Sequence, residues 1–143
     1  MHSEILKPVV ILAAWSMIMW IWMYATRLPA MKRAGLLDEP MIGGTGASLG
    51  PKLPLAVQWK ADNYNHLMEQ PTLFYAVALT LAFVGAGDSL NAMIAWAYVG
   101  LRIAHSLVQV TVNRVTIRFA IFMLSSLFLI MLIVHAVAIV FSQ

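Results

Sequence analysis

Two long stretches without a charged side chain constrain the fold more than any other feature of the sequence. One covers residues 8–26, and the other runs from Arg118 towards the C-terminus. About 20 consecutive apolar residues are enough for a helix to span the hydrocarbon core of a bilayer. Only 10% of the residues are charged and 62% are hydrophobic, whereas a soluble domain averages roughly 25% charged residues. We therefore predict an integral membrane protein.

The predicted fold class is all-α: an integral membrane protein built as a four-transmembrane-helix bundle, in a single domain over residues 1–143. The helices are expected at residues 8–26, 58–84, 90–112 and 115–141. Pro71 falls inside the second helix, where we expect neighbouring helices to accommodate the defect that a proline introduces. Residues 27–57 form a long connection, because their four prolines and several glycines exclude one continuous helix.

Basic residues are distributed unevenly among the predicted loops. They gather in the first loop and at the third: Arg27, Lys32, Arg33, Lys52 and Lys60, then Arg114 and Arg118. The second loop contains Asp88 and no basic residue. Cytoplasmic loops are enriched in lysine and arginine, so loops one and three are expected in the cytoplasm and both termini outside. The basic residues also follow the first apolar run, which favours an uncleaved helix over a signal peptide.

Polar side chains that are costly in a membrane recur at helical spacing in two of the predicted helices. They are Asp62, Asn65, His66 and Glu69 in the second helix, and Arg102, His105, Gln109 and Asn113 in the third. Arg114 and Arg118 lie four residues apart at the start of the fourth helix. With the predicted topology, all three segments lie towards the cytoplasmic side. We expect one site where they meet.

The arginines allow a structural interpretation beside a functional one. Arginine stays protonated in proteins, so Arg102 within the membrane requires an anion. An ion pair with Glu69 or Asp62 would join the second and third helices. Arg114 and Arg118 could reach lipid headgroups instead, although Arg118 lies one turn deeper and is better placed to face a site.

Several other functions are not favoured. A net charge of +3 with scattered basic residues argues against a nucleic-acid partner. The chain has no cysteine, which excludes disulfides, a cysteine nucleophile and thiolate metal sites. Asp62, His66 and Glu69 offer an alternative, a metal site with two carboxylates and an imidazole. The paired Glu-x-x-His motifs of di-iron bundles are absent, and we predict no metal.

Two further segments have a simple interpretation. The glycine-rich residues 43–50 lack the Gly-Lys-Ser/Thr ending of a phosphate-binding loop. We expect a flexible surface loop there, and the sequence leaves open whether its tip covers a site as a lid. His135, late in the fourth helix, is expected to be a packing residue rather than a catalytic one.

The sequence resembles the MAPEG family, the membrane-associated proteins of eicosanoid and glutathione metabolism. The segment GLRIAHSLVQVTVNRVTIR at 100–118 is similar to the family's third-helix arginine and the arginines that bracket the start of the fourth helix. The segment NHLMEQPTLFY at 65–75 is similar to the family's Asn/Glu pair followed by proline. Four helices with a long first loop and short later loops complete the resemblance, which is greatest to the bacterial branch.

The resemblance implies a homotrimer with sites between neighbouring subunits and glutathione as co-substrate. Arg118 would be the catalytic arginine that stabilises the glutathione thiolate. The binding residues would be Asn65, His66, Glu69, Arg102, His105, Gln109 and Arg114. A free thiol has a pKa of about 8.5, and a guanidinium beside it favours the nucleophilic thiolate. The bilayer would supply hydrophobic electrophiles.

The chain also departs from the family's pattern. Asp62 or Lys60 stands where eukaryotic members have an arginine, Gln109 occupies a tyrosine position, and Phe119 follows Arg118 where the prostaglandin enzyme has serine. The expected function is a membrane-bound glutathione-dependent transferase or peroxidase acting on hydrophobic electrophiles, in a bacterial inner membrane. The alternative is a non-catalytic protein of the same fold, whose polar residues form structural ion pairs or lipid contacts.

Overall fold

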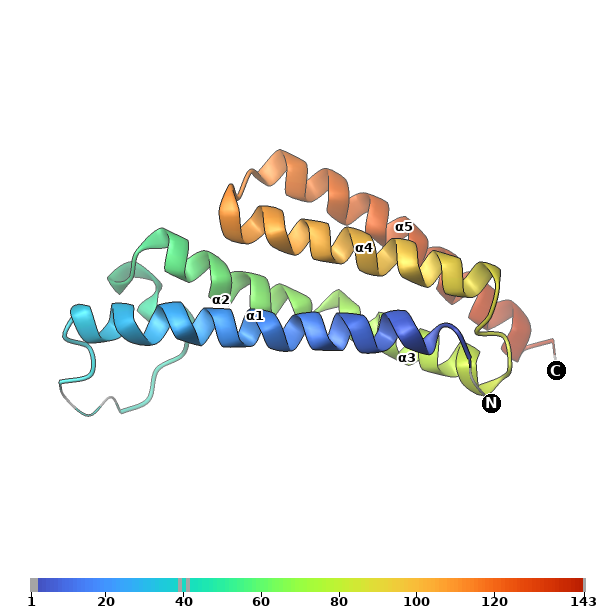
Figure 1. Ribbon diagram of the computed structural model, residues 1–143, viewed down its shortest axis with the longest axis horizontal. Coiled ribbons are helices and arrows are strands. Elements are labelled where there is room, and N and C mark those ends of the chain that lie inside the picture. Colours follow the sequence, from blue (N-terminus) through green and yellow to red (C-terminus); the bar gives the residue numbers. More distant parts are fainter. Residues whose placement is uncertain (1–2, 39, 41, 143) are drawn as a thin grey trace.

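The structure is a computed structural model that describes residues 3–38, 40 and 42–142 (Figure 1). Over these residues it contains helices and no strand, which confirms the prediction of an all-α protein. The elements are α1 (Leu6–Arg33), the short 3-10 helix η1 (Ala47–Lys52), α2 (Leu55–Leu67), α3 (Gln70–Phe83), α4 (Leu90–Thr111) and α5 (Val115–Val140). Three of them, α1, α4 and α5, are long and apolar enough to cross a membrane.

The first helix is longer than expected, because α1 continues past residue 26 to Arg33 with Pro29 inside it. A proline within a helix removes one backbone hydrogen bond and normally interrupts the helix. Here the last turns are held by the chain that returns from the long loop. Ala30 and Met31 are buried against Leu53 in a small apolar cluster. This tertiary packing outweighs the local effect of Pro29.

The long connection between α1 and α2 is tied to α1. The Arg27 guanidinium donates a 2.6 Å hydrogen bond from Nη2 to the Gly46 carbonyl. A Cβ atom at Gly46 would lie 3.4 Å from Arg27 Nη1, which is an ordinary van der Waals contact. Part of the glycine-rich segment forms η1. The described residues of this loop therefore form specific contacts with α1 and are more than a surface covering.

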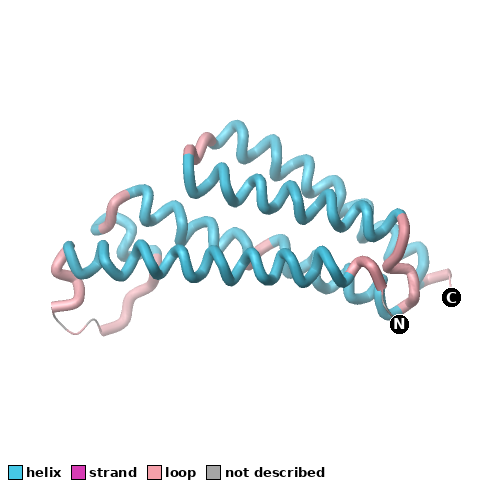
Figure 2. Tube along the Cα trace, in the orientation of Figure 1, coloured by secondary structure: helices cyan, strands magenta, loops and turns pink. Residues whose placement is uncertain are grey.

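The predicted second helix, residues 58–84, is two helices that meet at Met68 and Glu69 (Figure 2). Glu69 has φ −85° and ψ −99°, which is outside the helical region. Pro71 is the second residue of α3 and has no N–H to donate to the Leu67 carbonyl, and its ring would clash with that carbonyl. The neighbouring helices do not absorb Pro71 into one helix. The break is instead part of the fold, and it creates the polar site.

The α4 helix lies at the centre, in contact with α1, α2 and α5. The ring of Tyr98 in α4 stacks on the ring of Phe74 in α3. The two ring centroids are 4.7 Å apart, and both side chains are fully buried. The N-terminal segment binds the loop between α3 and α4, where Ile5 N donates to the Gly87 carbonyl at 2.9 Å. Both ends of the chain therefore lie beside this loop, and the α1–α2 loop lies at the opposite end (Figure 1).

Candidate functional site

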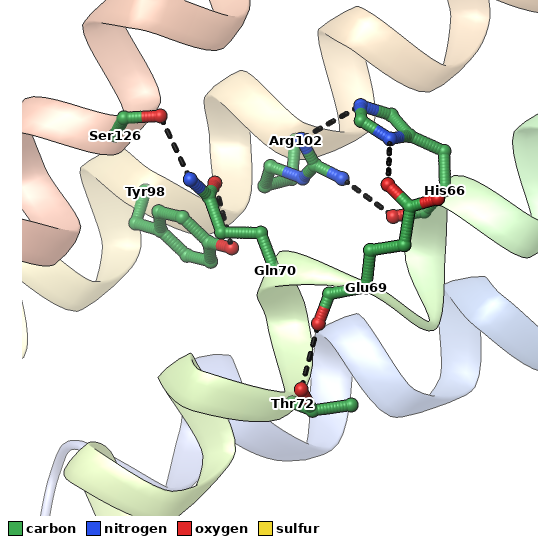
Figure 3. A network of polar contacts seen from close by, with 7 residues as sticks. All are labelled: His66, Glu69, Gln70, Thr72, Tyr98, Arg102 and Ser126. Carbon is green, nitrogen blue, oxygen red and sulfur yellow. Dashed lines mark hydrogen bonds and ion pairs between the residues drawn. The ribbon is translucent and has the colours of Figure 1, made fainter.

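The break between α2 and α3 brings a histidine and a carboxylate together. His66 is in the last turn of α2, and Glu69 lies at the start of α3. His66 Nδ1 and Glu69 Oε2 are 2.8 Å apart (Figure 3). The Glu69 carbonyl also accepts a 2.7 Å hydrogen bond from the Thr72 hydroxyl. The break between α2 and α3 therefore positions the Glu69 carboxylate, which does not lie on the face of one continuous helix.

Arg102 of α4 is fully buried and reaches across to this break. Its Nη2 donates to the His66 carbonyl at 3.0 Å, and its Nη1 lies 3.5 Å from His66 Nε2. The last carbonyls of a helix have no partner within the helix, and the His66 carbonyl accepts from this guanidinium and, at 3.4 Å, from Glu69 N. The side chain therefore joins α4 to the C-terminal end of α2.

The expected ion pair between Arg102 and a carboxylate is not formed. Among the residues that the structure describes, no Asp or Glu oxygen lies within 4.0 Å of Arg102. Asp62 is exposed and accepts a 2.9 Å hydrogen bond from Gln58 instead. His66 stands between Arg102 and Glu69, so the positive charge is not neutralised directly. Arg102 Nε is buried and finds no partner in the described part of the chain.

A pocket of about 190 Å³ lies beside this network, between α2, α4 and the start of α5. Its polar lining consists of His66, His105 and Arg118, and its apolar lining of Val115, Phe119 and Phe122. The rings of His66 and His105 are 4.8 Å apart between centroids, and Phe122 is 5.6 Å from His66. Three of the predicted site residues thus share one cavity.

Arg118 is half-buried at the wall of this pocket. Its Nη1 donates to Asn113 Oδ1 at 2.6 Å, and its Nε is buried without a hydrogen-bond partner among the described residues. No described carboxylate lies within 4.0 Å of the guanidinium. Asn113 has φ +49°, in the left-handed region that asparagine tolerates better than most residues. The turn between α4 and α5 therefore orients Arg118 without neutralising it.

Four of the residues expected near the site lie elsewhere. Asn65 and Asp62 line a second pocket of about 390 Å³ between α1, α2 and the long loop, where Arg27 and Gly46 also lie. Gln109 is buried on α4 but does not line the Arg118 pocket, and its Oε1 has no partner within the described residues. Arg114 is exposed at the start of α5 and is also absent from the pocket lining.

The described residues of the long loop do not line the Arg118 pocket. Its residues Thr45, Gly46 and Ala47 line the second pocket, and none of the residues around Arg118 comes from the loop. Met41 and Glu39, which belong to the same loop, lie outside the described residues. If the loop acts as a lid, its described residues therefore lie at the second pocket.

Two hydrogen-bonded groups in the structure are not among the residues predicted from the sequence. Gln70 donates to Ser126 Oγ at 2.8 Å, and its Oε1 lies 3.5 Å from the Tyr98 hydroxyl, which joins α3, α4 and α5 (Figure 3). Asn63 donates to Ser106 Oγ at 2.8 Å between α2 and α4, and both are buried. For Gln70, the signal available in the sequence was its position directly before Pro71. A proline there makes the preceding residues the start of a new helix.

The arrangement favours an anion rather than a metal. Two guanidinium groups lie at or next to the pocket, and Glu69 is the carboxylate bonded to this network. No group of three or more His, Asp or Glu side chains that could hold a metal ion occurs among the described residues. An uncompensated guanidinium attracts negative charge and lowers the pKa of a neighbouring acid. The pocket can therefore stabilise an anionic nucleophile beside an apolar wall.

Comparison with known proteins gives a family for this arrangement. The sequence model of the MAPEG family matches residues 5–138, nearly the whole chain. No curated protein and no solved structure matches the chain. The family is membrane-bound, and its members include glutathione transferases and peroxidases as well as non-catalytic proteins. With three helices long and apolar enough to span a membrane and a match over nearly its full length, the chain belongs to the MAPEG family.

Proposed function

We propose that this protein is a glutathione-dependent transferase or peroxidase that acts on hydrophobic electrophiles. The observation that carries the proposal is the position of Arg118. Its guanidinium lines a pocket that also has His66 and His105, and no described carboxylate neutralises it. Family membership supplies glutathione as the thiol that such proteins generally use.

The proposed role of Arg118 is to stabilise the thiolate. A free thiol with a pKa of about 8.5 is mostly protonated at neutral pH. An opposite charge within about 4–6 Å lowers the pKa of an acid by roughly 1–3 pH units. A decrease of about 2 pH units would make the thiolate, which is the nucleophile, the main form at neutral pH. Arg118 Nη1 is bonded to Asn113, and no hydrogen bond to Nη2 is formed among the described residues, so Nη2 is the donor available for this contact.

The electrophile would enter from the apolar side. Val115 and Phe119 line the pocket and are exposed on the surface of α5, where the bilayer would lie. Phe122 forms the inner part of the same wall. A hydrophobic molecule dissolved in the membrane could therefore reach the thiolate without crossing water. The residue at 119 would then influence which electrophiles fit.

The assembly we propose is a homotrimer in a bacterial inner membrane, with loops one and three in the cytoplasm. The α2 and α3 helices together would form the fourth membrane pass, because each alone has only 13 or 14 residues. Asn65 and Arg118 line different pockets of one subunit. Sites formed between neighbouring subunits would allow both residues to contact one glutathione. The trimer would also cover part of the apolar surface of α5.

A non-catalytic protein is the second candidate, and one observation favours it. Arg102 is fully buried, and its hydrogen bond to the His66 carbonyl is a structural role. If Arg118 had the same role through Asn113, the polar residues would serve only to hold the helices together. The two candidates therefore differ in whether Arg118 acts on a ligand.

Ultraviolet difference absorbance of detergent-purified protein tests the proposal, because a bound thiolate absorbs where the thiol does not. Wild type should show a thiolate signal with glutathione near neutral pH, and Arg118→Ala should lose it. Arg33→Ala is the matched control, since it removes an exposed arginine at the end of α1 that does not line the pocket. Absence of any signal or binding in wild type at millimolar glutathione would favour the non-catalytic protein.

A further inference from the structure

The hydrogen bond between His66 and Glu69 connects the pocket to the surface. The His66 side chain lines the pocket with Arg118, and it is 22% exposed. The Glu69 side chain is 67% exposed, and its Oε2 lies 2.8 Å from His66 Nδ1 (Figure 3). The pair thus extends from the place where an anion would form to a side chain exposed at the surface of the subunit.

The partner of each ring nitrogen indicates which one is basic. A carboxylate can only accept, so Nδ1 carries the proton that it donates to Glu69, and Nε2 carries the lone pair. The nearest polar contact of Nε2 is Arg102 Nη1 at 3.5 Å, which is at the limit of a hydrogen bond. Arg102 makes its shorter bond, 3.0 Å, to the His66 carbonyl. The imidazole therefore keeps a basic nitrogen in a ring that lines the pocket.

We propose that His66 and Glu69 form the route by which the thiol proton leaves the pocket. The inference rests on the proposed function, since it requires a thiol bound beside Arg118. The S–H bond breaks and its proton bonds to His66 Nε2, while the Nδ1 proton passes to Glu69 Oε2. Glu69 then releases the proton to water. The electron pair of the S–H bond stays on sulfur as the thiolate, and nothing is oxidised or reduced.

The surrounding charges explain why the carboxylate is needed. Arg102 and His105 of α4 and Arg118 of α5 face His66, and Glu69 is the acidic group in contact with it. A positive charge on the imidazole would be opposed by the two guanidinium groups. Transfer of the Nδ1 proton to Glu69 avoids that accumulation. His105 lines the same pocket, but among the described residues it has no carboxylate within 4.0 Å.

Rapid mixing of detergent-purified protein with glutathione separates this route from the thiolate stabilisation itself. Thiolate absorbance and proton release, followed with a pH indicator, are recorded for wild type, His66→Gln and Glu69→Gln. We expect thiolate formation to be about 100-fold slower in His66→Gln and about tenfold slower in Glu69→Gln, in line with the usual contribution of a general base. The final thiolate amplitude at saturating glutathione should remain, because Arg118 is unchanged.

His135→Gln is the matched control, because His135 bonds to Asn91 and does not line the pocket. Added imidazole should restore the rate of His66→Gln and leave wild type unchanged, which a structural defect would not produce. Equal rates in wild type and both variants, or a lost amplitude without a slower rate, would overturn the proposed route. Absence of a thiolate signal in wild type would instead overturn the proposed function. If His66→Gln does not fold, Glu69→Gln decides the matter at an exposed side chain.

Discussion

Two polar groups at opposite ends of the bundle have different surroundings. At the end near the chain termini, His135 Nδ1 lies 2.7 Å from Asn91 Oδ1, and Asn91 Nδ2 donates to the Ala86 carbonyl at 2.8 Å. At the other end, Arg102 and Arg118 each have a buried Nε without a partner among the described residues. The first group is internally paired, and the second lies at or beside a pocket.

The difference separates a structural role from a chemical one more clearly than residue type does. Both groups place a histidine among helices of a membrane protein, and each would count as a candidate site by composition alone. The Asn91–His135 pair uses its hydrogen bonds to attach α4 to α5. Arg118 retains an unpaired donor and an uncompensated charge beside the pocket. Unpaired polar atoms next to a cavity are therefore the better indicator of function here.

Removing Arg102 should have the largest effect on stability. Arg102→Met keeps much of the side-chain length but removes the guanidinium bond to the His66 carbonyl, which then keeps only the 3.4 Å bond from Glu69 N. We expect the free energy of unfolding to fall by about 3 kcal/mol, because a buried hydrogen bond to a charged group is lost. Thermal unfolding in detergent measures it. An unchanged melting temperature would mean that Arg102 does not hold α2 to α4.

The paired group at the other end should also affect stability, but not glutathione. Asn91→Ala removes the partner of His135 and of the Ala86 carbonyl. The expected loss is about 2 kcal/mol, since buried groups are left unsatisfied. Glutathione binding, measured by equilibrium titration, should be the same as in wild type. A large change in binding would contradict the purely structural role of this pair.

Gln70 should contribute less. Gln70→Leu preserves the approximate volume while removing the bonds to Ser126 and Tyr98. We expect a loss of about 1 kcal/mol, the usual net value of a neutral hydrogen bond. The melting temperature of Ser126→Ala provides the comparison. A much larger loss in Gln70→Leu than in Ser126→Ala would assign most of the stabilisation to the Tyr98 contact.

Asp62 should matter least. Its carboxylate is exposed and bonds to Gln58 rather than to Arg102. Asp62→Asn is therefore expected to change stability by less than about 0.5 kcal/mol, as for most surface substitutions. Thermal unfolding beside Arg102→Met tests this directly. Similar losses in the two variants would restore the ion pair that the structure does not show.

The sequence predicts much of the fold, because long apolar runs identify the helices without tertiary information. The boundary errors have specific causes. α1 continues through Pro29 because the returning loop packs on Ala30 and Met31, which no local pattern in α1 reveals. The helix expected at 58–84 breaks at Met68 and Glu69, because Pro71 cannot donate to the Leu67 carbonyl and its ring would clash with it.

The candidate site was predictable only in part. His66, His105 and Arg118 do share a pocket, and Arg102 lies next to it. Helical spacing placed Asn65 on the same face as His66, but the two residues line different pockets. One pocket lies between α2, α4 and α5, and the other lies between α1, α2 and the long loop. Periodicity gives the face of a helix and not the neighbour it meets. The His66–Glu69 bond depends on the break, so it could not be inferred from a continuous helix.

The most direct test measures thiolate absorbance and melting temperature together in two variants, Arg118→Ala and Asn91→Ala. We expect Arg118→Ala to lose the thiolate signal while its stability changes by less than about 1 kcal/mol, because the Asn113 bond that it loses is only part-buried. Asn91→Ala should lose stability and keep the signal. If Arg118→Ala keeps the thiolate, or if both variants lose stability alone, Arg118 is a structural residue like the pair at the other end.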